Sequence, residues 1–584
     1  MAQRAFLCEP DKNQSEAADE GPKMPGQAGH DEKDNKIHND MLKDGQLYIA
    51  HSENGNINLV GKMANRHGLI AGATGTGKTV TLQVLAETFS QAGVPCFMAD
   101  MKGDLSGISQ PGKLSGFIEK RMPEFGIENP EFAGCPTRFF DVFGEQGFPM
   151  RATVSAMGPQ LLARLMELTE VQTGVLNAVF RIADDNNLLL IDLKDLKLML
   201  DFVGKNAAQF TTEYGNIAPA SIGAIQRSVL QIESEGGNQF FGEPAFNVED
   251  LFAVENGRGV MNVLAADKLM LNPKLYSTYL LWLMTELYAN LPEVGDLELP
   301  KFVFFFDEAH MLFDGTSKAL VDKIEQVIRL IRSKGVGIYF ITQVPSDVPV
   351  NVLAQLSNRV QHALRAYTPQ DQKAVRAAAQ TFRPNPSFKT EEAILDLGTG
   401  EALVSFLDEK GAPSVVERAK ILFPLSQIGA ITPGQRMDIQ ATAPKKLKDY
   451  EKFFDRESAY EVLTEARQKA EEEAEKERKA LEKQKEKEAK AKEKEKEKKA
   501  SSKSKKAGIG RTILGTMIAA AATSFARSAG TRIGKSIGGS STKKSTSTTK
   551  KSTSTAKKTN TATKKAVNTA ARKVTTEILK NIFK

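Results

Sequence analysis

One stretch of the sequence has the residue types and spacing of a phosphate-binding loop. Leu69–Ala71 is a short apolar strand, and a helix with apolar positions on one side is expected over Thr81–Ala92. The loop between them matches the pattern G-x-x-x-x-G-K-[ST] at every required position, and it consists of Gly72, Ala73, Thr74, Gly75, Thr76, Gly77, Lys78 and Thr79.

Each residue type in this loop has a chemical reason. Glycines allow backbone conformations in which successive N–H groups face phosphate oxygens, and a helix N-terminus adds a favourable partial positive charge. Lys78 can reach the β- and γ-phosphates, while the hydroxyl of Thr79 can bind Mg²⁺. The sequence therefore predicts a site for a nucleoside triphosphate, ATP, together with Mg²⁺.

A pair of carboxylates follows a strongly apolar strand far downstream. Phe302–Phe306 is apolar at every position, as in a central parallel strand buried on both faces, and Asp307 and Glu308 follow it. At the end of such a strand Asp307 would hold Mg²⁺ through water, and Glu308 would polarise the attacking water. Because adjacent buried acids are costly without a role, the pair indicates hydrolysis rather than binding alone.

Polar residues also end two other predicted strands. Gly337–Thr342 ends at Gln343, which we interpret as a contact to the γ-phosphate or its water; the alternative is a cap of the next turn. Val94–Ala99 is followed by Asp100 and Asp104, and either carboxylate can touch Mg²⁺ or its water, or cap a turn or helix.

Four arginines lie close to these last segments: Arg329, Arg332, Arg359 and Arg365. An arginine that reaches the phosphate of a neighbouring subunit would stabilise charge in the transition state. Each can equally be a surface or ion-pair residue. Arg332 and Arg359 are the preferred candidates for the catalytic role.

The candidates are spread over a chain of 584 residues whose patterns predict an α/β fold in several parts. Strand-like and helix-like runs alternate across residues 45–157 and 251–444, which we predict to form one P-loop core with a mainly parallel sheet. Arg151–Val154 is expected to be one of its strands. Between these parts, apolar residues at helical spacing predict a helical subdomain inserted at residues 158–250.

The two ends of the chain differ from this core. Residues 1–44 are polar without periodicity, which predicts disorder. Residues 445–505 place opposite charges three or four positions apart, which predicts a solvated helix with a coiled-coil seam at most in its first turns. Residues 506–584 form a basic low-complexity tail, in which lysine pairs recur every seven residues from Lys543, and it ends in an amphipathic helix.

Composition favours a cytoplasmic protein. Cys8, Cys96 and Cys135 have no disulfide or metal-ligand spacing, as expected in a reducing compartment. No stretch approaches the ~20 apolar residues that a membrane span needs, and the N-terminus lacks the features of a secretory signal. The formal net charge of +6 hides a basic C-terminal end.

Several segments together resemble the HerA/FtsK superfamily of ring-forming P-loop ATPases, and most closely its YjgR-type branch with a HerA helicase C-terminal-like domain. The resemblance covers roughly residues 46–430 and rests on the phosphate loop, the Asp307–Glu308 pair, Met63–Gly68, Met98–Leu105, Ile225–Leu230 and Ile341–Gln343. It implies a RecA-like core, ATP and Mg²⁺ as ligands, and a homo-hexameric ring with sites at subunit interfaces. It supports the roles given to Lys78, Thr79, Asp307, Glu308 and Gln343, and it does not identify the arginine.

Two functions are open at this point. HerA and FtsK relatives move double-stranded DNA, so the leading hypothesis is a DNA translocase or helicase-like motor whose ring channel and basic tail bind duplex. The alternative is a protein-handling or envelope-associated ATPase, docked on a partner protein or an anionic membrane surface by the C-terminal amphipathic helix. A GTP-dependent switch is disfavoured, because no Asn-Lys-x-Asp motif follows the core strands.

Overall fold

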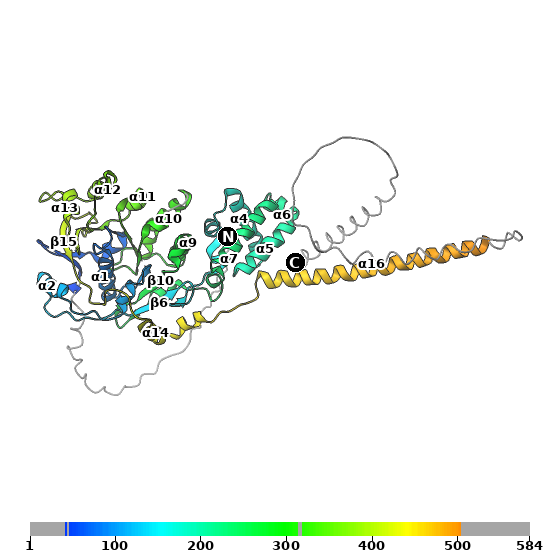
Figure 1. Cartoon of the computed structure of the whole chain (residues 1–584), viewed down its shortest axis with the longest axis horizontal. Coiled ribbons are helices and arrows are strands. Elements are labelled where there is room, and N and C mark those ends of the chain that lie inside the picture. The colour runs from blue at the N-terminus through cyan, green and yellow to red at the C-terminus, as the bar shows by residue number, and fades with distance from the viewer. Residues whose placement is uncertain (1–40, 44–45, 314–317, 504–584) are drawn as a thin grey trace, which may run out of the picture. The chain divides into compact units, whose positions relative to one another are not determined.

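The computed structural model describes residues 41–43, 46–313 and 318–503 (Figure 1). These residues divide into two units. The sheet unit contains the described chain up to Phe140 together with Val248–Pro273 and Leu283–Ala443, and the helical unit contains Asp141–Asn247, Lys274–Trp282 and the described chain from Pro444. The disorder predicted over residues 1–44 is wrong at its end, where Leu42–Lys43 form a strand that pairs with Gln46–Leu47. Residues 1–40, the basic tail and the C-terminal amphipathic helix lie outside the described residues.

Parallel strands form the centre of the sheet unit, in the spatial order β13, β4, β12, β11, β5 and β10. Their bounds are β4 Gly68–Ala71, β5 Cys96–Asp100, β10 Met261–Ala265, β11 Phe302–Phe306, β12 Val336–Thr342 and β13 Asn358–Gln361. Beyond β13 the sheet continues with antiparallel strands in the order β14, β15, β2 and β1, and β3 pairs with β2. On the other side β6 follows β10.

The remaining strands and the helices of the sheet unit surround this centre. The strands are β1 Leu42–Lys43, β2 Gln46–Ser52, β3 Gly55–Leu59, β6 Thr137–Asp141, β14 Glu401–Ser405, β15 Glu417–Ile421 and the hairpin β8 Val254–Glu255 with β9 Arg258–Gly259. The α-helices are α1 Lys78–Gln91, α2 Gly116–Phe125, α10 Lys318–Ile331, α11 Val350–Leu353, α12 Pro369–Ala379, α13 Thr390–Asp396 and α14 Pro433–Thr442. The 3₁₀ helices are η2 Gly61–Arg66, η3 Leu105–Ser109, η4 Val248–Leu251, η5 Leu269–Leu271, η6 Ala309–Leu312, η7 Arg332–Lys334 and η8 Pro345–Asp347.

The central strands are apolar because both faces of the sheet are covered. Every residue of β11 is fully buried, between β12 on one side and β5 on the other. Helix α1 covers one face, where Phe89 lies 6.0 Å from the ring of Tyr339 and 6.4 Å from the ring of Phe305. This burial fixes the direction in which the loop between β4 and α1 leaves the sheet. The predicted α/β fold with a mainly parallel sheet is confirmed.

Two strand assignments differ from the sequence patterns. The strand predicted at Arg151–Val154 is wrong, because Thr153 is the N-cap of helix α3 and its hydroxyl accepts a hydrogen bond from Ala156 N at 3.0 Å. Strand β13 has no apolar pattern that would predict it. Its Asn358 is buried and donates to the carbonyls of Met63 (3.0 Å) and His67 (3.2 Å), so hydrogen bonds to backbone replace apolar packing there.

The helical unit contains most of the region between β6 and η4 and the chain after α14. Its elements are β7 Phe148–Pro149, α3 Val154–Leu165, α4 Glu170–Asp185, α5 Leu193–Lys205, α6 Ala207–Tyr214, α7 Pro219–Ser234, α8 Gly237–Phe240, α15 Lys445–Lys448, the 3₁₀ helix η9 Asp449–Glu451 and α16 Ala459–Lys503. Helix α9 (Pro273–Asn290) contributes residues to both units.

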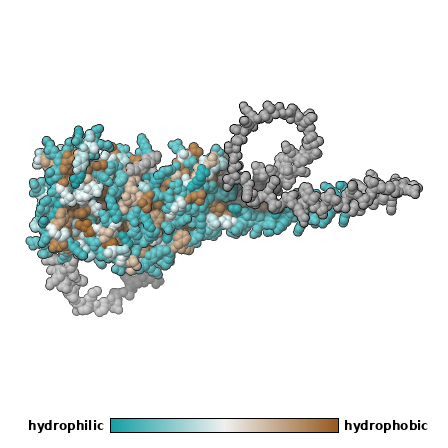
Figure 2. All heavy atoms as spheres, viewed as in Figure 1, coloured by the Kyte–Doolittle hydropathy of each residue, from teal (hydrophilic) through white to brown (hydrophobic). Residues whose placement is uncertain are grey.

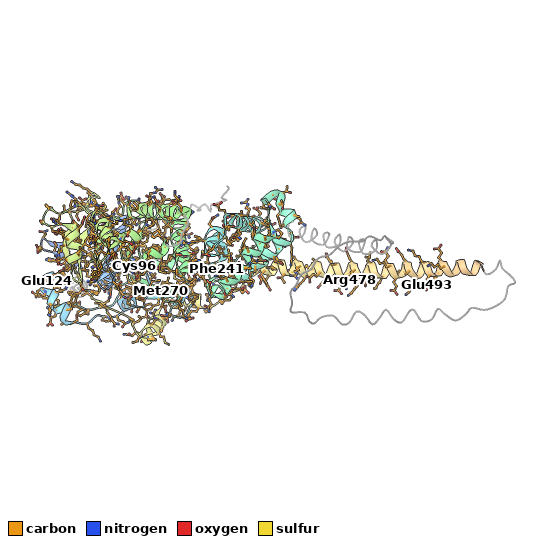
Figure 3. All side chains as sticks on the ribbon, turned by 45° about the horizontal axis from the view of Figure 1, so that its top comes forward. Cys96, Glu124, Phe241, Met270, Arg478 and Glu493 are labelled. Carbon is orange, nitrogen blue, oxygen red and sulfur yellow. The ribbon has the colours of Figure 1, made fainter. Side chains whose placement is uncertain are left out.

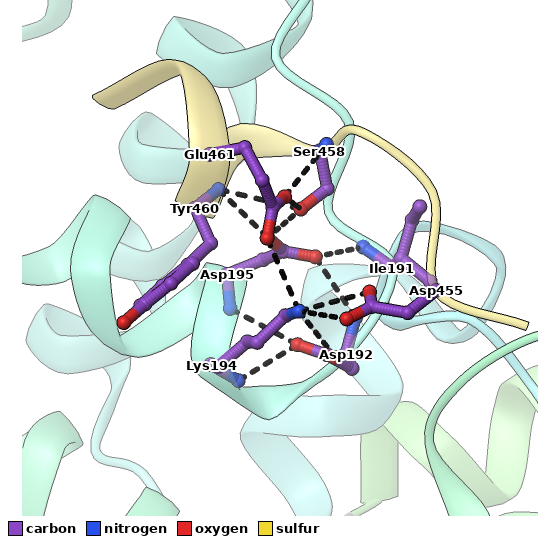
Figure 4. A network of polar contacts seen from close by, with 8 residues as sticks. All are labelled: Ile191, Asp192, Lys194, Asp195, Asp455, Ser458, Tyr460 and Glu461. Carbon is purple, nitrogen blue, oxygen red and sulfur yellow. Dashed lines mark hydrogen bonds and ion pairs between the residues drawn. The ribbon is translucent and has the colours of Figure 1, made fainter. Parts of the chain in front are cut away.

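A buried carboxylate joins the N-termini of α5 and α16 (Figure 4). Asp195 Oδ2 accepts from Ile191 N (2.8 Å) and Asp192 N (3.1 Å), which caps the start of α5. Its Oδ1 accepts from Tyr460 N at 2.9 Å and from the hydroxyl of Ser458. Since both oxygens are used and the residue is fully buried, Asp195 fixes the beginning of α16 on the helical unit.

Beyond this anchor α16 is a solvated helix. From Glu471 to Lys496 nearly every side chain is exposed, including those of Arg478 and Glu493, which extend away from the helix in Figure 3. Where α16 is visible in Figure 2 its surface is hydrophilic. Pairs four residues apart, such as Lys479 with Glu475 at 2.9 Å, run along it and stabilise the isolated helix by a few tenths of a kcal/mol each. Across the described ranges, no helix is long and apolar enough to cross a membrane.

Replacing Asp195 by alanine should destabilise the helical unit. The substitution leaves the amides of Ile191 and Asp192 without an acceptor and leaves Tyr460 N only its longer bond to Ser458 Oγ, which we expect to lower the free energy of unfolding by about 2–3 kcal/mol. Urea unfolding measures this, and hydrogen exchange should quicken at the start of α16 and not in β11. Asp201→Ala is the control, since its exposed pair with Lys205 contributes about 0.5 kcal/mol or less. Equal losses in both variants would contradict the anchoring role.

Candidate functional site

The loop Gly72–Thr79 connects the end of β4 to the start of α1 and has the form of an anion-binding turn. Gly77 is the N-cap of α1 at φ +116°, and Gly75 has φ +79°, both in the left-handed region that favours glycine. A Cβ on Gly75 would meet nothing within 4 Å, so this part of the loop faces open space. The first bond of the helix runs from Thr81 N to Gly77 O at 3.0 Å, which leaves the N–H groups of Lys78 and Thr79 without an acceptor within the helix.

Neighbouring loops hold the backbone of this loop in place. Gly72 N donates to Gln343 O at 3.1 Å, and Ala73 N donates to Ala363 O at 2.9 Å. Thr76 O accepts from Gly400 N at 3.0 Å. These contacts come from the segments that follow β12 and β13 and precede β14, so segments on both sides of β4 hold the loop.

Lys78 lies across the loop that precedes it. Its Nζ donates to Gly72 O at 2.6 Å and to Ala73 O at 3.2 Å. Burial lowers the pKa of Lys78, while the charges of Glu308 and Asp307 act in the opposite direction. The lysine is therefore within the electrostatic reach of the carboxylate pair that the sequence predicted as its partner.

The carboxylate pair lies at the end of β11. Asp307 Oδ1 accepts from Glu308 N at 2.9 Å, and burial together with the charge of Glu308 raises the pKa of Asp307 to about 6. Glu308 has the left-handed backbone angles φ 47° and ψ 50°. Its Oε1 lies 3.2 Å from Lys102 Nζ, and its Oε2 is buried and accepts no hydrogen bond from the described residues. His310 Nδ1 is 3.5 Å from that second oxygen.

The sheet order brings most of the predicted site together. Strand β12 lies between β4 and β11, and Thr342 is in register with Ala71 while Phe340 is in register with Phe306. Because all three strands are parallel, the phosphate loop, Gln343 and the Asp307–Glu308 pair follow them at the same edge. Gln343 is exposed there.

The two arginine candidates lie near the opposite, N-terminal ends of the parallel strands. Arg332 belongs to η7, just before β12 begins, and burial lowers its pKa. Arg359 is the second residue of β13, in register with Leu69. Its guanidinium donates to the carbonyls of Thr381 (2.7 Å), Leu356 (3.0 Å) and Leu353 (3.2 Å). The structure therefore does not bring either arginine to the phosphate loop of its own chain.

A buried aspartate ends β5 next to the site. Asp100 Oδ2 accepts from Ser106 N at 3.1 Å, and burial raises the pKa of Asp100 to about 6. Its Oδ1 is buried and has no hydrogen-bond partner among the described residues. Both interpretations made from the sequence fit this geometry, because one oxygen caps the following turn and the other is available.

The sequence predicted no role for three residues at the site: Lys102 contacts the carboxylate pair, and His362 and Arg121 support the loop. Lys102 contacts Glu308, and only its place in the polar run after β5 pointed to it. His362 is buried beneath the loop, and a Cβ on Gly72 would meet the Cβ of His362 at 2.5 Å. Arg121 donates to Thr399 O (3.0 Å) and Gly400 O (3.2 Å), and its guanidinium lies 4.5 Å from the Phe117 ring centroid. No local pattern marks the last two.

The loop and the carboxylate pair supply oxygen ligands and N–H donors. A metal ion there would depend on further ligands from a phosphate. In the described part of the chain, no group of three or more His, Cys, Asp or Glu side chains could hold a metal ion. The hydroxyl of Thr79 and the carboxylate of Asp307 are oxygen donors of the kind that Mg²⁺ prefers when phosphates supply further ligands. Fold and site together define a P-loop protein of the α/β class.

The sequence places the chain in a known family. The family model described as Helicase HerA-like C-terminal matches residues 46–545. This match covers most of the chain, so the protein belongs to the HerA-like family, and the resemblance inferred from its motifs is confirmed. No curated protein matches the chain by sequence.

Several solved structures resemble this structure at low sequence identity. The unbound bacterial conjugative coupling protein TrwBdeltaN70 is 16% identical, with a TM-score of 0.43 over 68% of this chain and 93% of that one. VirB4 of Thermoanaerobacter pseudethanolicus is 14% identical, with a TM-score of 0.41 over 65% and 97%. TrwB in complex with ADP and Mg²⁺ is 16% identical, with a TM-score of 0.41 over 63% and 88%. The family assignment rests on the sequence match alone.

Removing the guanidinium of Arg121 should loosen the phosphate loop. Arg121→Met takes away the donors to Thr399 and Gly400, and Gly400 is the residue whose N–H holds Thr76. We expect several-fold faster hydrogen exchange in residues 72–79 and 398–401. Lys120→Met, one position away on the exposed side of α2, is the control. Unchanged hydrogen exchange in Arg121→Met would show that the loop does not depend on the hydrogen bonds from Arg121 to Thr399 and Gly400.

Proposed function

We propose that this protein is a Mg²⁺-dependent ATPase whose site is formed by Gly72–Thr79, Asp307, Glu308 and Gln343. One observation carries the proposal. A loop whose Lys78 and Thr79 N–H groups have no acceptor within α1, the Lys78 side chain and a carboxylate pair all follow parallel strands at one edge of the sheet. A phosphate-binding loop alone would support binding, and the adjacent pair adds the groups that water activation requires.

The residues present fit the predicted ligands. The open space at Gly75 leaves room for phosphate oxygens against the backbone, and the N-terminus of α1 points toward them. Thr79 and Asp307 would hold Mg²⁺, directly and through water respectively. When bound there, Mg²⁺ would neutralise part of the phosphate charge.

Each side chain then has a distinct task. Lys78 exchanges its two carbonyl acceptors for phosphate oxygens, since its Nζ already lies over the loop. Glu308 accepts a hydrogen bond from the attacking water and polarises it. Gln343 contacts that water or the γ-phosphate from the strand between the other two elements. With its pKa at about 6, Asp307 is mostly ionised at pH 7.5, as a metal ligand must be.

We further propose that the ATPase is a motor that acts on double-stranded DNA as a homo-hexameric ring. Membership of the HerA-like family supports this proposal. So does the charge of residues 541–584, which contain twelve Lys or Arg and one acidic residue, Glu577. Arg332 is the better candidate for an arginine that acts on a neighbouring subunit, because the guanidinium of Arg359 is occupied by three carbonyls of its own chain.

Two substitutions separate binding from hydrolysis. Lys78→Ala should weaken ATP binding at least ten-fold and abolish turnover, since it removes the cation that contacts the phosphates. Glu308→Gln should keep ATP affinity within two-fold and lower kcat by about 10²-fold or more, because the amide cannot polarise water as a carboxylate does. Fluorescent-nucleotide titration and phosphate release measure the two effects, with the exposed Glu128→Gln as the control. Normal hydrolysis by Glu308→Gln would refute its assignment.

The proposed motor function can be tested by measuring ATP turnover with and without duplex DNA. We expect the duplex to raise ATP turnover several-fold at low salt, with the stimulation falling steeply as salt rises, because phosphate contacts release counterions. Deletion of residues 541–584 should reduce the stimulation and leave basal turnover unchanged. Turnover indifferent to duplex, single-stranded DNA and RNA at low salt would refute the motor and favour the protein-handling alternative.

A further inference from the structure

A lysine from the segment after β5 contacts the predicted catalytic carboxylate. Strands β5 and β11 are paired in parallel, with Met98 in register with Phe305, so the residues that follow them lie at one edge. There Lys102 Nζ donates to Glu308 Oε1 at 3.2 Å. The Lys102 side chain is 52% exposed, whereas that of Glu308 is only 15% exposed. A half-exposed lysine is thus hydrogen-bonded to a carboxylate that is largely enclosed.

The two oxygens of Glu308 are in different situations. Oε1 is held by Lys102, while Oε2 is buried without a hydrogen-bond donor among the described residues, with His310 Nδ1 at 3.5 Å. The left-handed backbone of Glu308 restricts where its side chain can point, and this conformation costs on the order of 1 kcal/mol or more for a residue other than glycine. The surroundings therefore select one orientation of the carboxylate.

We propose that Lys102 is a positioning residue that fixes the orientation of the Glu308 carboxylate through its hydrogen bond to Oε1. This inference rests on the proposed ATPase function and adds a residue to it. Across the described ranges, Lys102 is the lysine or arginine that contacts Glu308, because Lys78 donates to the carbonyls of Gly72 and Ala73.

A positioning role has a specific kinetic consequence. Lys102 touches the carboxylate and not the loop that binds phosphate, so its loss should lower kcat and leave the affinity for ATP unchanged. A lysine that instead moved to the γ-phosphate would contribute to binding, and its loss would raise Kd for ATP. The two roles can therefore be separated by a KM-against-kcat comparison.

The first experiment compares Lys102→Met and Lys102→Arg with the wild type and with Lys113→Met, an exposed lysine of the same unit. We expect Lys102→Met to lower kcat about ten-fold with KM and the Kd of a fluorescent ATP analogue within two-fold. Lys102→Arg should restore part of the loss, since a cation returns to Glu308. An unchanged or increased kcat, or a loss that appears in Kd, would overturn the proposal.

The second experiment does not depend on turnover. Pulsed acetylation followed by mass spectrometry reports the reactivity of Lys102 in the full-length protein without nucleotide. Glu308→Gln removes the charge partner and should raise acetylation of Lys102 several-fold relative to Lys113. An unchanged rate would show that the contact is absent in solution and overturn the inference, whereas a wild type with this contact and without ATP turnover would refute the ATPase proposal instead.

Discussion

The phosphate loop depends on backbone hydrogen bonds that its neighbours supply. Its amides at Gly72 and Ala73 donate to carbonyls after β12 and β13, and the carbonyl of Thr76 accepts from the segment before β14. Because the N–H groups of Gly72 and Ala73 are used in this way, they are not available to a ligand, whereas those of Lys78 and Thr79 have no acceptor within α1. Position 72 must be glycine on steric grounds, because a side chain there would collide with His362.

Beneath the loop, buried polar groups tie α1 to the end of the sheet unit. His362 Nδ1 donates to Glu401 O at 2.9 Å, so its Nε2 accepts from the Thr81 hydroxyl at 2.7 Å, and burial keeps the ring neutral by lowering its pKa to about 4. On the same helix, Glu87 accepts from Leu425 N (2.8 Å) and Ser426 N (3.0 Å), and burial raises its pKa to about 7. Each group has its partners, so α1 is fixed in rotation as well as in position, and the direction of its N-terminus follows from that.

The sequence predicted those parts of the site that follow from local patterns and strand ends. The glycine loop, the apolar β11 with its carboxylates and the end of β12 are local features, and parallel pairing then places them at one edge. Strand β13 was not predicted because its buried Asn358 bonds to the carbonyls of Met63 and His67, far away in the sequence, instead of packing as an apolar residue. Arg121 and His362 act through contacts across 39 to 300 residues of chain, which no local pattern encodes. Thr153 was misassigned because of its local pattern. Threonine next to valine favours a strand, whereas here Thr153 caps the helix that follows it.

The charges of the site are arranged so that ATP would have to redistribute them. Lys78 is bonded to two carbonyls, Lys102 to Glu308, and Asp307 to the amide of Glu308. A triphosphate competes for Lys78 with neutral acceptors, whereas it would have to compete for Lys102 with a carboxylate, and a charge-assisted hydrogen bond is the stronger of the two. Lys78 should therefore transfer to phosphate first, while Lys102 stays on Glu308. Under the proposed function, this order would keep the Glu308 carboxylate oriented during nucleotide entry. The segment after β5 would then contribute to catalysis without touching the nucleotide.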